Sequence, residues 1–293
     1  MTPAGRHRTG AVAKPPRTPE RSLIGIDLAW SPRNPTGVAA LAPSGRGLAV
    51  MASRIVHGDD EILAFVAAHL APTSVVMIDA PLVVPNDTGM RACDRLTHVE
   101  FGRAQAGAYP ANRIHMGRLN GGTPRGEEIA RRLATLGFPW PPGDLPKAGA
   151  HRGHWVFECY PHPAQVVLFG LGATLKYKKK RQSWPAARAA FQRYLAHVEA
   201  LRRPRLLLDP ALSASLDPGC RVGRAYKERE DRLDAIFCAY LGALALDGRL
   251  RMLGRPAEGG IVVPRGTIDV QRAALPRSRT TSRTPSTTRA RRT

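Results

Sequence analysis

The stretch that decides the fold is residues 23–31, LIGIDLAWS, which places one carboxylate, Asp27, in an otherwise apolar run of strand length. A charge buried without a partner is costly, so Asp27 needs other groups close to it. Three later stretches supply further acids: SVVMIDAPL with Asp79, WVFECYPHP with Glu158, and KEREDRLDAIFCAYLGAL with Asp231 and Asp234. We expect acids from these distant parts of the chain to converge on divalent metal.

Apolar runs joined by short turns follow this first strand. The runs at 23–30, 36–43 and 48–56 predict a three-stranded antiparallel meander. The apolar face of EILAFVAAHL, residues 61–70, predicts a helix. SVVMIDAPL, residues 74–82, does not alternate between apolar and polar residues, which is typical of a central parallel strand. The first third of the chain therefore predicts an α/β fold with a mixed sheet.

The amino-acid composition changes at residues 84–154, which are rich in Gly, Pro, Arg and Asn. We expect an insertion with helices near 91–105 and 125–136 that overhangs the site. The main fold then resumes with predicted elements listed here in order: a strand at 155–163, helices at 163–171 and 185–203, a loop at 204–222, a helix at 228–246, and a strand GGIVVP at 259–264 that closes an edge of the sheet.

The two ends of the chain lack apolar periodicity. Residues 1–21 and 269–293 are rich in Arg and Pro, with Ser and Thr in the second segment, so we expect disordered tails around one domain at 22–268. The formal charge of the chain is +21, of which residues 1–22 carry +4 and residues 269–293 carry +6. The remaining +11 favours phosphate-rich partners, nucleic acid above all. An Arg-biased composition is the alternative, because Arg outnumbers Lys 37 to 7.

The sequence lacks targeting signals and cysteine ligand motifs, which argues against several classes of protein. The N-terminal segment has no apolar region of a secretory signal, and no apolar run reaches membrane-spanning length, so we expect a cytoplasmic chain without a membrane partner. The four cysteines are scattered without a CxxC pair, which argues against a zinc site and for free thiols.

The acids on the predicted last helix are spaced to share one face. Asp231 and Asp234 are three residues apart, and the same face continues through Cys238 and Leu241, the apolar side that packs on a sheet. Both carboxylates should therefore point inward. Hard oxygen ligands without soft ones indicate Mg²⁺ or Mn²⁺. Two such ions roughly 3.5–4 Å apart could act on a phosphodiester bond.

The order of these elements and the motifs GIDLAW, IDAPL, ECYPHP and KEREDRLDAIFCAY resemble domain-of-unknown-function family 429, over roughly residues 23–264. The resemblance implies a ribonuclease H-like, resolvase-type fold and a predicted nuclease activity. By matching position it implies the metal ligands Asp27, Asp79, Asp231 and Asp234, and the catalytic residues Asp27, Asp79, Glu158 and Asp234. The role that it leaves for Glu158 is an additional ligand or a clamp on a basic group, and a buried salt bridge is the alternative.

A basic run, KYKKKR at 176–181, follows the strand that carries Glu158 and has Trp184 just beyond it. Such a run could hold phosphates while its aromatic residues stack on bases, and the alternative is a solvated loop. The predicted substrate-binding residues are Lys176, Lys178, Lys179, Lys180 and Arg181.

Three functions from different classes compete at this point. The first is a metal-dependent nuclease that hydrolyses phosphodiester bonds. The second is a nucleic-acid-binding protein without catalysis. The third is an actin-like or sugar-kinase-like nucleotide-binding protein, which normally needs a duplicated domain and a glycine-rich turn after the first strand. Neither of these features is visible in the sequence.

Overall fold

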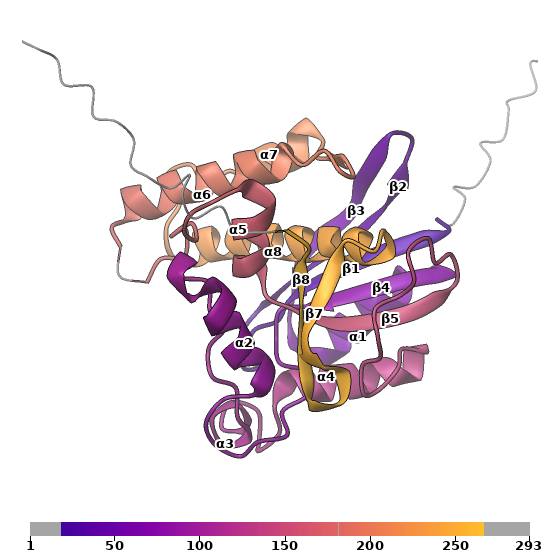
Figure 1. Cartoon of the computed structure of the whole chain (residues 1–293). Helices are drawn as coiled ribbons and strands as arrows, with labels where there is room; N and C mark the ends of the chain where they lie inside the picture. Colours follow the sequence, from indigo (N-terminus) through magenta and orange to yellow (C-terminus); the bar gives the residue numbers. More distant parts are fainter. Residues whose placement is uncertain (1–18, 181, 267–293) are drawn as a thin grey trace, which may run out of the picture.

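An eight-stranded mixed sheet forms the centre of the computed structural model, which describes residues 19–180 and 182–266 (Figure 1). The strands are β1 (Arg21–Asp27), β2 (Thr36–Ser44), β3 (Gly47–Val56), β4 (Thr73–Ile78), β5 (Gly153–Cys159), β6 (Leu206–Leu207), β7 (Leu250–Arg255) and β8 (Gly259–Pro264). The helices are α1 (Gly58–Ala68), α2 (Ala92–Phe101), α3 (Arg113–Gly117), α4 (Arg125–Leu133), α5 (Pro161–Phe169), α6 (Trp184–Glu199), α7 (Pro210–Leu216) and α8 (Gly223–Leu246).

The strand order across the sheet is β6-β3-β2-β1-β4-β5-β8-β7. Strands β1, β2 and β3 form the predicted antiparallel meander, whereas β4 pairs in parallel with β1 on one side and with β5 on the other. Every residue of β4 is buried, because helices cover both of its faces. The mixed sheet predicted from the sequence is confirmed, and this order of elements is the one expected of a ribonuclease H-like fold.

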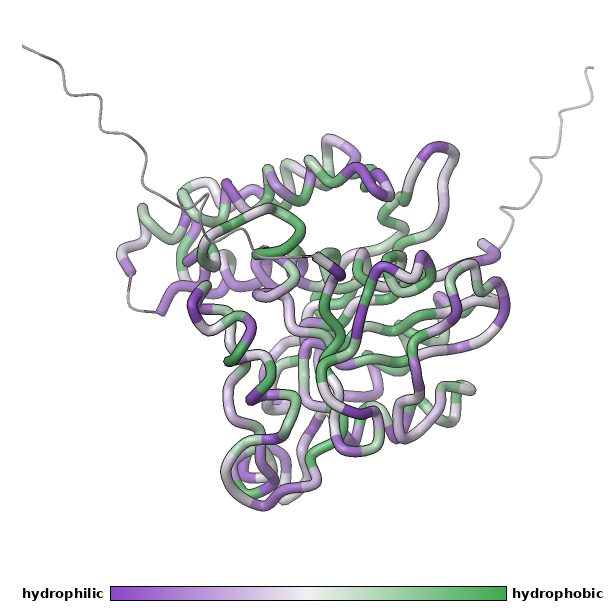
Figure 2. The backbone as a smooth tube through the Cα atoms, viewed as in Figure 1, coloured by the Kyte–Doolittle hydropathy of each residue, from purple (hydrophilic) through white to green (hydrophobic). Residues whose placement is uncertain are grey.

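The helices cover the sheet in two layers, and strand residues alternate between them. Leu23, Val75 and Met77 belong to the core under α8 and α6. Ile24 and Val76 belong to the core under α1 and α4 on the opposite face. Figure 2 shows the resulting pattern, with hydrophobic strands at the centre and hydrophilic residues toward the outside. A carboxylate on these strands therefore faces one layer or the other according to its parity.

Two glycines allow α8 to lie directly on the backbone of the meander. A Cβ atom at Gly25 of β1 would lie 2.0 Å from the carbonyl oxygen of Ala235, and one at Gly37 of β2 would lie 2.1 Å from that of Asp231. Gly37 is the partner of Asp27 in the β1–β2 register. This close approach brings Asp231 next to the end of β1.

Several predicted boundaries differ from the structure. The strand GGIVVP does not close an edge, because β8 lies between β5 and an additional strand, β7, which was not predicted from the sequence. The loop predicted at 204–222 contains β6 and α7, and α8 begins at Gly223 rather than at residue 228. Residues 160–163, predicted to extend a strand, lead into α5 because Pro161 and Pro163 suit a first helical turn.

The insertion predicted at 84–154 contains the two expected helices, α2 and α4, and the short α3 between them. The predicted disordered tails fall mostly on residues 1–18 and 267–293, which are outside the described residues, and Arg21 already belongs to β1. Among the helices that the structure describes, none combines the length and the apolar character that crossing a bilayer requires.

The contact between α8 and the sheet can be tested at Gly25. We expect Gly25→Ala to lower the free energy of unfolding by about 3 kcal/mol or more, because the added methyl group would overlap helix backbone that cannot move aside. Gly102→Ala is the matched control, since nothing lies within 4 Å of its Cβ position and its φ of −60° is helical. Denaturant unfolding of both variants measures the difference. Equal stability of the two variants would contradict the close packing.

Candidate active site

Two acids lie side by side at the carboxyl ends of neighbouring parallel strands. Asp27 is the last residue of β1, and Asp79 directly follows β4. The amide of Asp79 donates a hydrogen bond of 2.9 Å to the carbonyl oxygen of Ile26, which continues the pairing of the two strands. By parity both side chains lie on the face that α8 covers. The ends of parallel strands are where open α/β sheets commonly bind ligands.

Helix α8 contributes a third acid to the same place. Asp27, Asp79 and Asp231 line one cavity of about 650 Å³, although more than 200 residues separate the first of them from the last. Three lysines, Lys178, Lys180 and Lys227, line the same cavity. The structure thus brings together three of the four predicted metal ligands and two of the predicted phosphate-binding lysines.

Burial and mutual repulsion make these carboxylates reluctant to ionise together. Burial, the negative charge of Asp27 and a hydrogen-bonding contact with Asp27 raise the pKa of Asp231 to about 9, in spite of Lys227. Burial and the charge of Asp27 also raise the pKa of Asp79 well above its ordinary value. Acids whose pKa values are displaced in this way are typical of sites that bind a cation or transfer a proton.

Two of the lysines partly neutralise the acids. Lys178 Nζ lies 3.0 Å from Oδ2 of Asp234, and Lys227 Nζ lies 2.9 Å from Oε1 of Glu230 and also contacts Asp231. Burial disfavours the charged form of Lys178, but Asp234, Asp27 and other nearby acids outweigh it and raise the pKa of Lys178 well above its ordinary value. Asp27, Asp79, Glu230, Asp231 and Asp234 leave an excess of three formal negative charges over these two ammonium groups.

Asp234 points inward, as its spacing from Asp231 predicts, but it lies behind the cavity. It is fully buried, and its Oδ1 accepts a hydrogen bond of 2.8 Å from the hydroxyl of Tyr177 while Oδ2 contacts Lys178. Oδ1 is therefore hydrogen-bonded, whereas Oδ2 has the ion pair with Lys178 and no hydrogen-bond partner among the described residues. The metal-binding and catalytic roles predicted for Asp234 remain predictions, and the observed contacts instead suit the orientation of Lys178.

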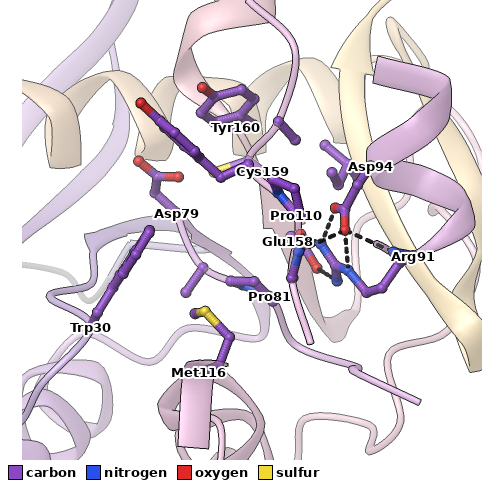
Figure 3. A pocket seen from close by; sticks show the side chains of 15 residues that line it. Trp30, Asp79, Pro81, Arg91, Asp94, Pro110, Met116, Glu158, Cys159 and Tyr160 are labelled. Carbon is purple, nitrogen blue, oxygen red and sulfur yellow. Dashed lines mark hydrogen bonds and ion pairs between the residues drawn. The ribbon is translucent and has the colours of Figure 1, made fainter. Parts of the chain in front are cut away.

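Glu158 lies on the opposite face of the sheet from Asp27 and Asp79. In the β4–β5 register it is paired with Ile78, so it shares the parity of Val156 and not that of Phe157. Its oxygens accept hydrogen bonds of 2.6 and 2.8 Å from Arg91, which also binds Asp94 (Figure 3). Of the alternatives that the sequence left open, the observed contacts correspond to the buried salt bridge. Glu158 also lines, with Asp79, the small pocket drawn in Figure 3, and its catalytic role stays a prediction.

The basic run has side chains in several directions. Lys178 and Lys180 reach the cavity, whereas Lys176 contacts Thr174 Oγ1 at 3.1 Å and Lys179 lies 5.3 Å from the ring centre of Trp184. Arg181 lies outside the described residues. Of the four predicted lysines, which all lie in the described part of the chain, Lys178 and Lys180 are therefore the ones that a ligand in the cavity could meet.

The cavity also contains residues that were not predicted from the sequence to belong to the site. Its wall includes four ring-bearing side chains and one lysine: Trp30, Tyr109, Tyr160, His162 and Lys227. Burial and the charge of Lys178 lower the pKa of His162 to about 3, so this ring is neutral near pH 7. Lys227 could have been found from its position one helical turn before Asp231. Trp30 and Tyr109 come from separate loops and carry no shared sequence signal, whereas Tyr160 and His162 belong to the ECYPHP motif that spans the end of β5.

The loop that carries Trp30 is held by the insertion. Arg125 of α4 is buried and donates hydrogen bonds to the carbonyl oxygens of Ala29 and Ser31, at 2.6 and 3.1 Å. The same guanidinium forms an ion pair with Asp59 of α1 at 2.7 Å. The insertion thus fixes the segment that follows β1, as well as forming part of the cavity wall.

The donor set agrees with a hard divalent cation in its chemistry and only in part in its geometry. Asp27 and Asp231 are close enough to share a proton, and Asp79 is next to Asp27. Within residues 19–180 and 182–266, however, three acidic, histidine or cysteine side chains are nowhere gathered closely enough to enclose an ion. Asp27 and Asp231 therefore suit one cation bound by two protein carboxylates better than a cation fully enclosed by protein ligands.

The fold and the site define this chain as an α/β protein with a mixed sheet. Its acids lie at the carboxyl ends of the central strands and on the helix that crosses them. The chain belongs to the DUF429 family, described as proteins of unknown function, whose family model matches residues 25–258. That match covers the sheet, the insertion and α8. No curated protein and no solved structure matches the chain significantly.

The raised pKa of Asp231 predicts a pH dependence of stability. A carboxyl group whose pKa is higher in the folded chain than in the unfolded chain stabilises the fold at low pH, and this contribution is lost as the pH rises toward about 9. We expect the metal-free protein to lose stability between about pH 5 and pH 8.5, with a slope of up to about 1.4 kcal/mol per pH unit from this group. Asp231→Asn should reduce that slope.

Denaturant unfolding in EDTA at several pH values measures this effect. Asp60→Asn is the control, because Asp60 is an exposed acid on α1 that pairs with Arg132. A slope that is the same in Asp231→Asn and in the wild type would show that the carboxylates do not repel one another as the structure indicates.

Because Glu158 forms a buried ion pair with Arg91, we expect its substitution to destabilise the fold rather than to cause a specific loss of activity. We expect Glu158→Gln to lower the free energy of unfolding by about 3 kcal/mol, because it removes one charge from a buried ion pair. Glu128→Gln, in a more exposed pair with Arg131, should cost less than about 1 kcal/mol. A Glu158→Gln protein that is as stable as the wild type, and yet inactive, would make Glu158 a catalytic group instead.

Proposed function

We propose that this protein is a metal-dependent nuclease that hydrolyses phosphodiester bonds in the cavity formed by Asp27, Asp79 and Asp231. The observation that carries the proposal is the convergence of these three buried or half-buried acids with three lysines in one cavity. Acids and lysines that line one cavity suit a substrate that is itself an anion and reacts with the help of a cation.

Asp27 and Asp231 would hold the cation, because their carboxylates contact each other and carry too much negative charge to ionise together without one. When bound, Mg²⁺ or Mn²⁺ supplies Lewis-acid stabilisation of the charge that develops on a phosphoryl group. One ion is better supported than the two that the sequence suggested, since Asp234 is occupied by Tyr177 and Lys178.

The chain's own residues would perform the remaining tasks. Lys178, Lys180 and Lys227 lie where they can neutralise the phosphates of a bound strand, and Asp234 fixes Lys178 among the acids. Asp79 has a pKa raised by burial and by Asp27, which suits a group that accepts a proton from an attacking water. The basic charge of the remaining surface would favour the approach of a polyanion.

A nucleic-acid-binding protein without catalysis is the second candidate. The ion pairs of Lys178 with Asp234 and of Lys227 with Asp231 favour it, because lysines that already neutralise the acids reduce the need for a metal. The nucleotide-binding alternative of the actin-like or sugar-kinase-like type has less support, since residues 28–35 between β1 and β2 contain no glycine that could form a phosphate turn.

The decisive experiment is a cleavage panel with the full-length protein. Single-stranded and duplex RNA and DNA, a branched junction and a dinucleotide are each incubated with Mg²⁺, with Mn²⁺ or with EDTA. We expect cleavage of at least one substrate that depends on the metal. Asp27→Asn should lower its rate by more than about 100-fold, because changes even in the surroundings of metal ligands cost roughly 10- to 100-fold.

Asp60→Asn, which alters an exposed acid away from the cavity, should retain the wild-type rate. Binding of nucleic acid without cleavage of any substrate would favour the second candidate. Cleavage that persists in EDTA, or in Asp27→Asn, would remove the metal from the proposal.

A further inference from the structure

Two aromatic side chains at the cavity break the usual rule that large rings are buried. Among the described residues, Trp30 and Tyr109 are the aromatic residues that are exposed, with 42% and 60% of their surface accessible. Trp30 follows β1, and Tyr109 lies in the insertion, between α2 and α3. Their rings meet edge to face, with centroids 6.4 Å apart, although 79 residues separate them in the chain. Two separate loops thus present one aromatic surface.

This surface belongs to the same cavity as the acids and the lysines. Trp30 and Tyr109 line that cavity together with Asp27, Asp79 and Asp231. Figure 3 draws a smaller neighbouring pocket that shares Trp30, Asp79 and Tyr160 with this cavity, and shows Trp30 on one side of Asp79 and Tyr160 on the other. The cavity therefore has an acidic floor and a wall of aromatic rings, and its volume is in the range of sites that accept a ligand the size of a nucleotide.

A lysine joins the aromatic surface to the basic side of the cavity. Lys180 Nζ lies 5.2 Å from the ring centre of Tyr109 and 3.3 Å from its hydroxyl oxygen. A positive charge next to an exposed ring suits a ligand that combines a flat aromatic group with a phosphate. The loop of Trp30 is held by Arg125, so its ring is positioned before any ligand binds.

We propose that Trp30 and Tyr109 form a stacking platform for an unpaired nucleobase, so that the cavity takes single-stranded nucleic acid in preference to duplex. This inference rests on the proposed function, because it names the substrate class of the same site. In a duplex the faces of the bases are covered by their neighbours and cannot meet the rings. Stacking on a ring accepts any of the bases, so the platform selects strandedness and not sequence.

The test compares three fluorescent probes in EDTA, which separates binding from cleavage. The first is a single strand about 12 nucleotides long, the second is its duplex, and the third is a single strand of the same length and charge that lacks bases. Fluorescence anisotropy gives the affinity of the full-length wild type and of Trp30→Ala/Tyr109→Ala. We expect the wild type to bind the first probe most tightly and the double variant to lose about 5- to 100-fold for that probe. Its affinity for the strand without bases should not change.

Two further variants make the comparison specific. Trp30→Phe/Tyr109→Phe retains the rings and should keep most of the affinity, even though it removes the hydroxyl next to Lys180. Val99→Ala alters a side chain on α2 that is 81% exposed and away from the cavity, and should bind all probes as the wild type does. The basic tails are present in every variant, so their contribution cancels.

Each outcome decides the inference separately from the proposed function. Equal losses of the double variant on all three probes, or tighter wild-type binding to the duplex, would overturn the stacking platform. A loss of affinity that is confined to the strand with bases supports the stacking platform, even if no substrate is cleaved. In that case only the nuclease proposal fails. Metal-dependent cleavage of a duplex that the double variant performs at the wild-type rate keeps the nuclease and overturns the platform.

Discussion

The close contact between α8 and the first two strands is the constraint on which the rest of the structure depends. Gly25 and Gly37 leave no side chain between the helix and the sheet, so helix backbone rests directly on strand backbone. Asp231 then reaches the end of β1 without a longer side chain. A larger residue at either glycine would separate the acids as well as loosen the core, because one contact serves both purposes.

The charges of the site lower the stability of the fold. Five buried or half-buried acids around two lysines oppose folding, and the raised pKa values of Asp79 and Asp231 are the sign of that opposition. Such a cluster would have been replaced by apolar residues if stability alone mattered. Lys178 and Lys227 reduce the repulsion, and the fully buried strand β4 and the apolar core under α8 supply the stability that it removes.

Much of this fold could be predicted from the sequence, because its signals are local. The alternation of apolar runs and turns indicated the meander, and the spacing of Asp231 and Asp234 indicated an inward face of α8. The failures concern information that a sequence does not contain. The face that Glu158 occupies depends on the register of β5 with β4, and a shift by one residue would have placed it with the other acids. The platform of Trp30 and Tyr109 depends on how the insertion folds back over β1.

The hydrogen bonds of Arg125 make the insertion part of the structural unit that holds the cavity. Its guanidinium ties α4 to the loop after β1 and to α1, so three segments from different parts of the chain share one buried cation. An inserted segment that merely decorates a surface can be shortened, exchanged or lost without harm. This one supplies the donor for the backbone carbonyls of Ala29 and Ser31 next to the cavity, so its removal would leave them without their protein partner. The insertion and the sheet therefore form one structural unit, held together at the edge of the cavity.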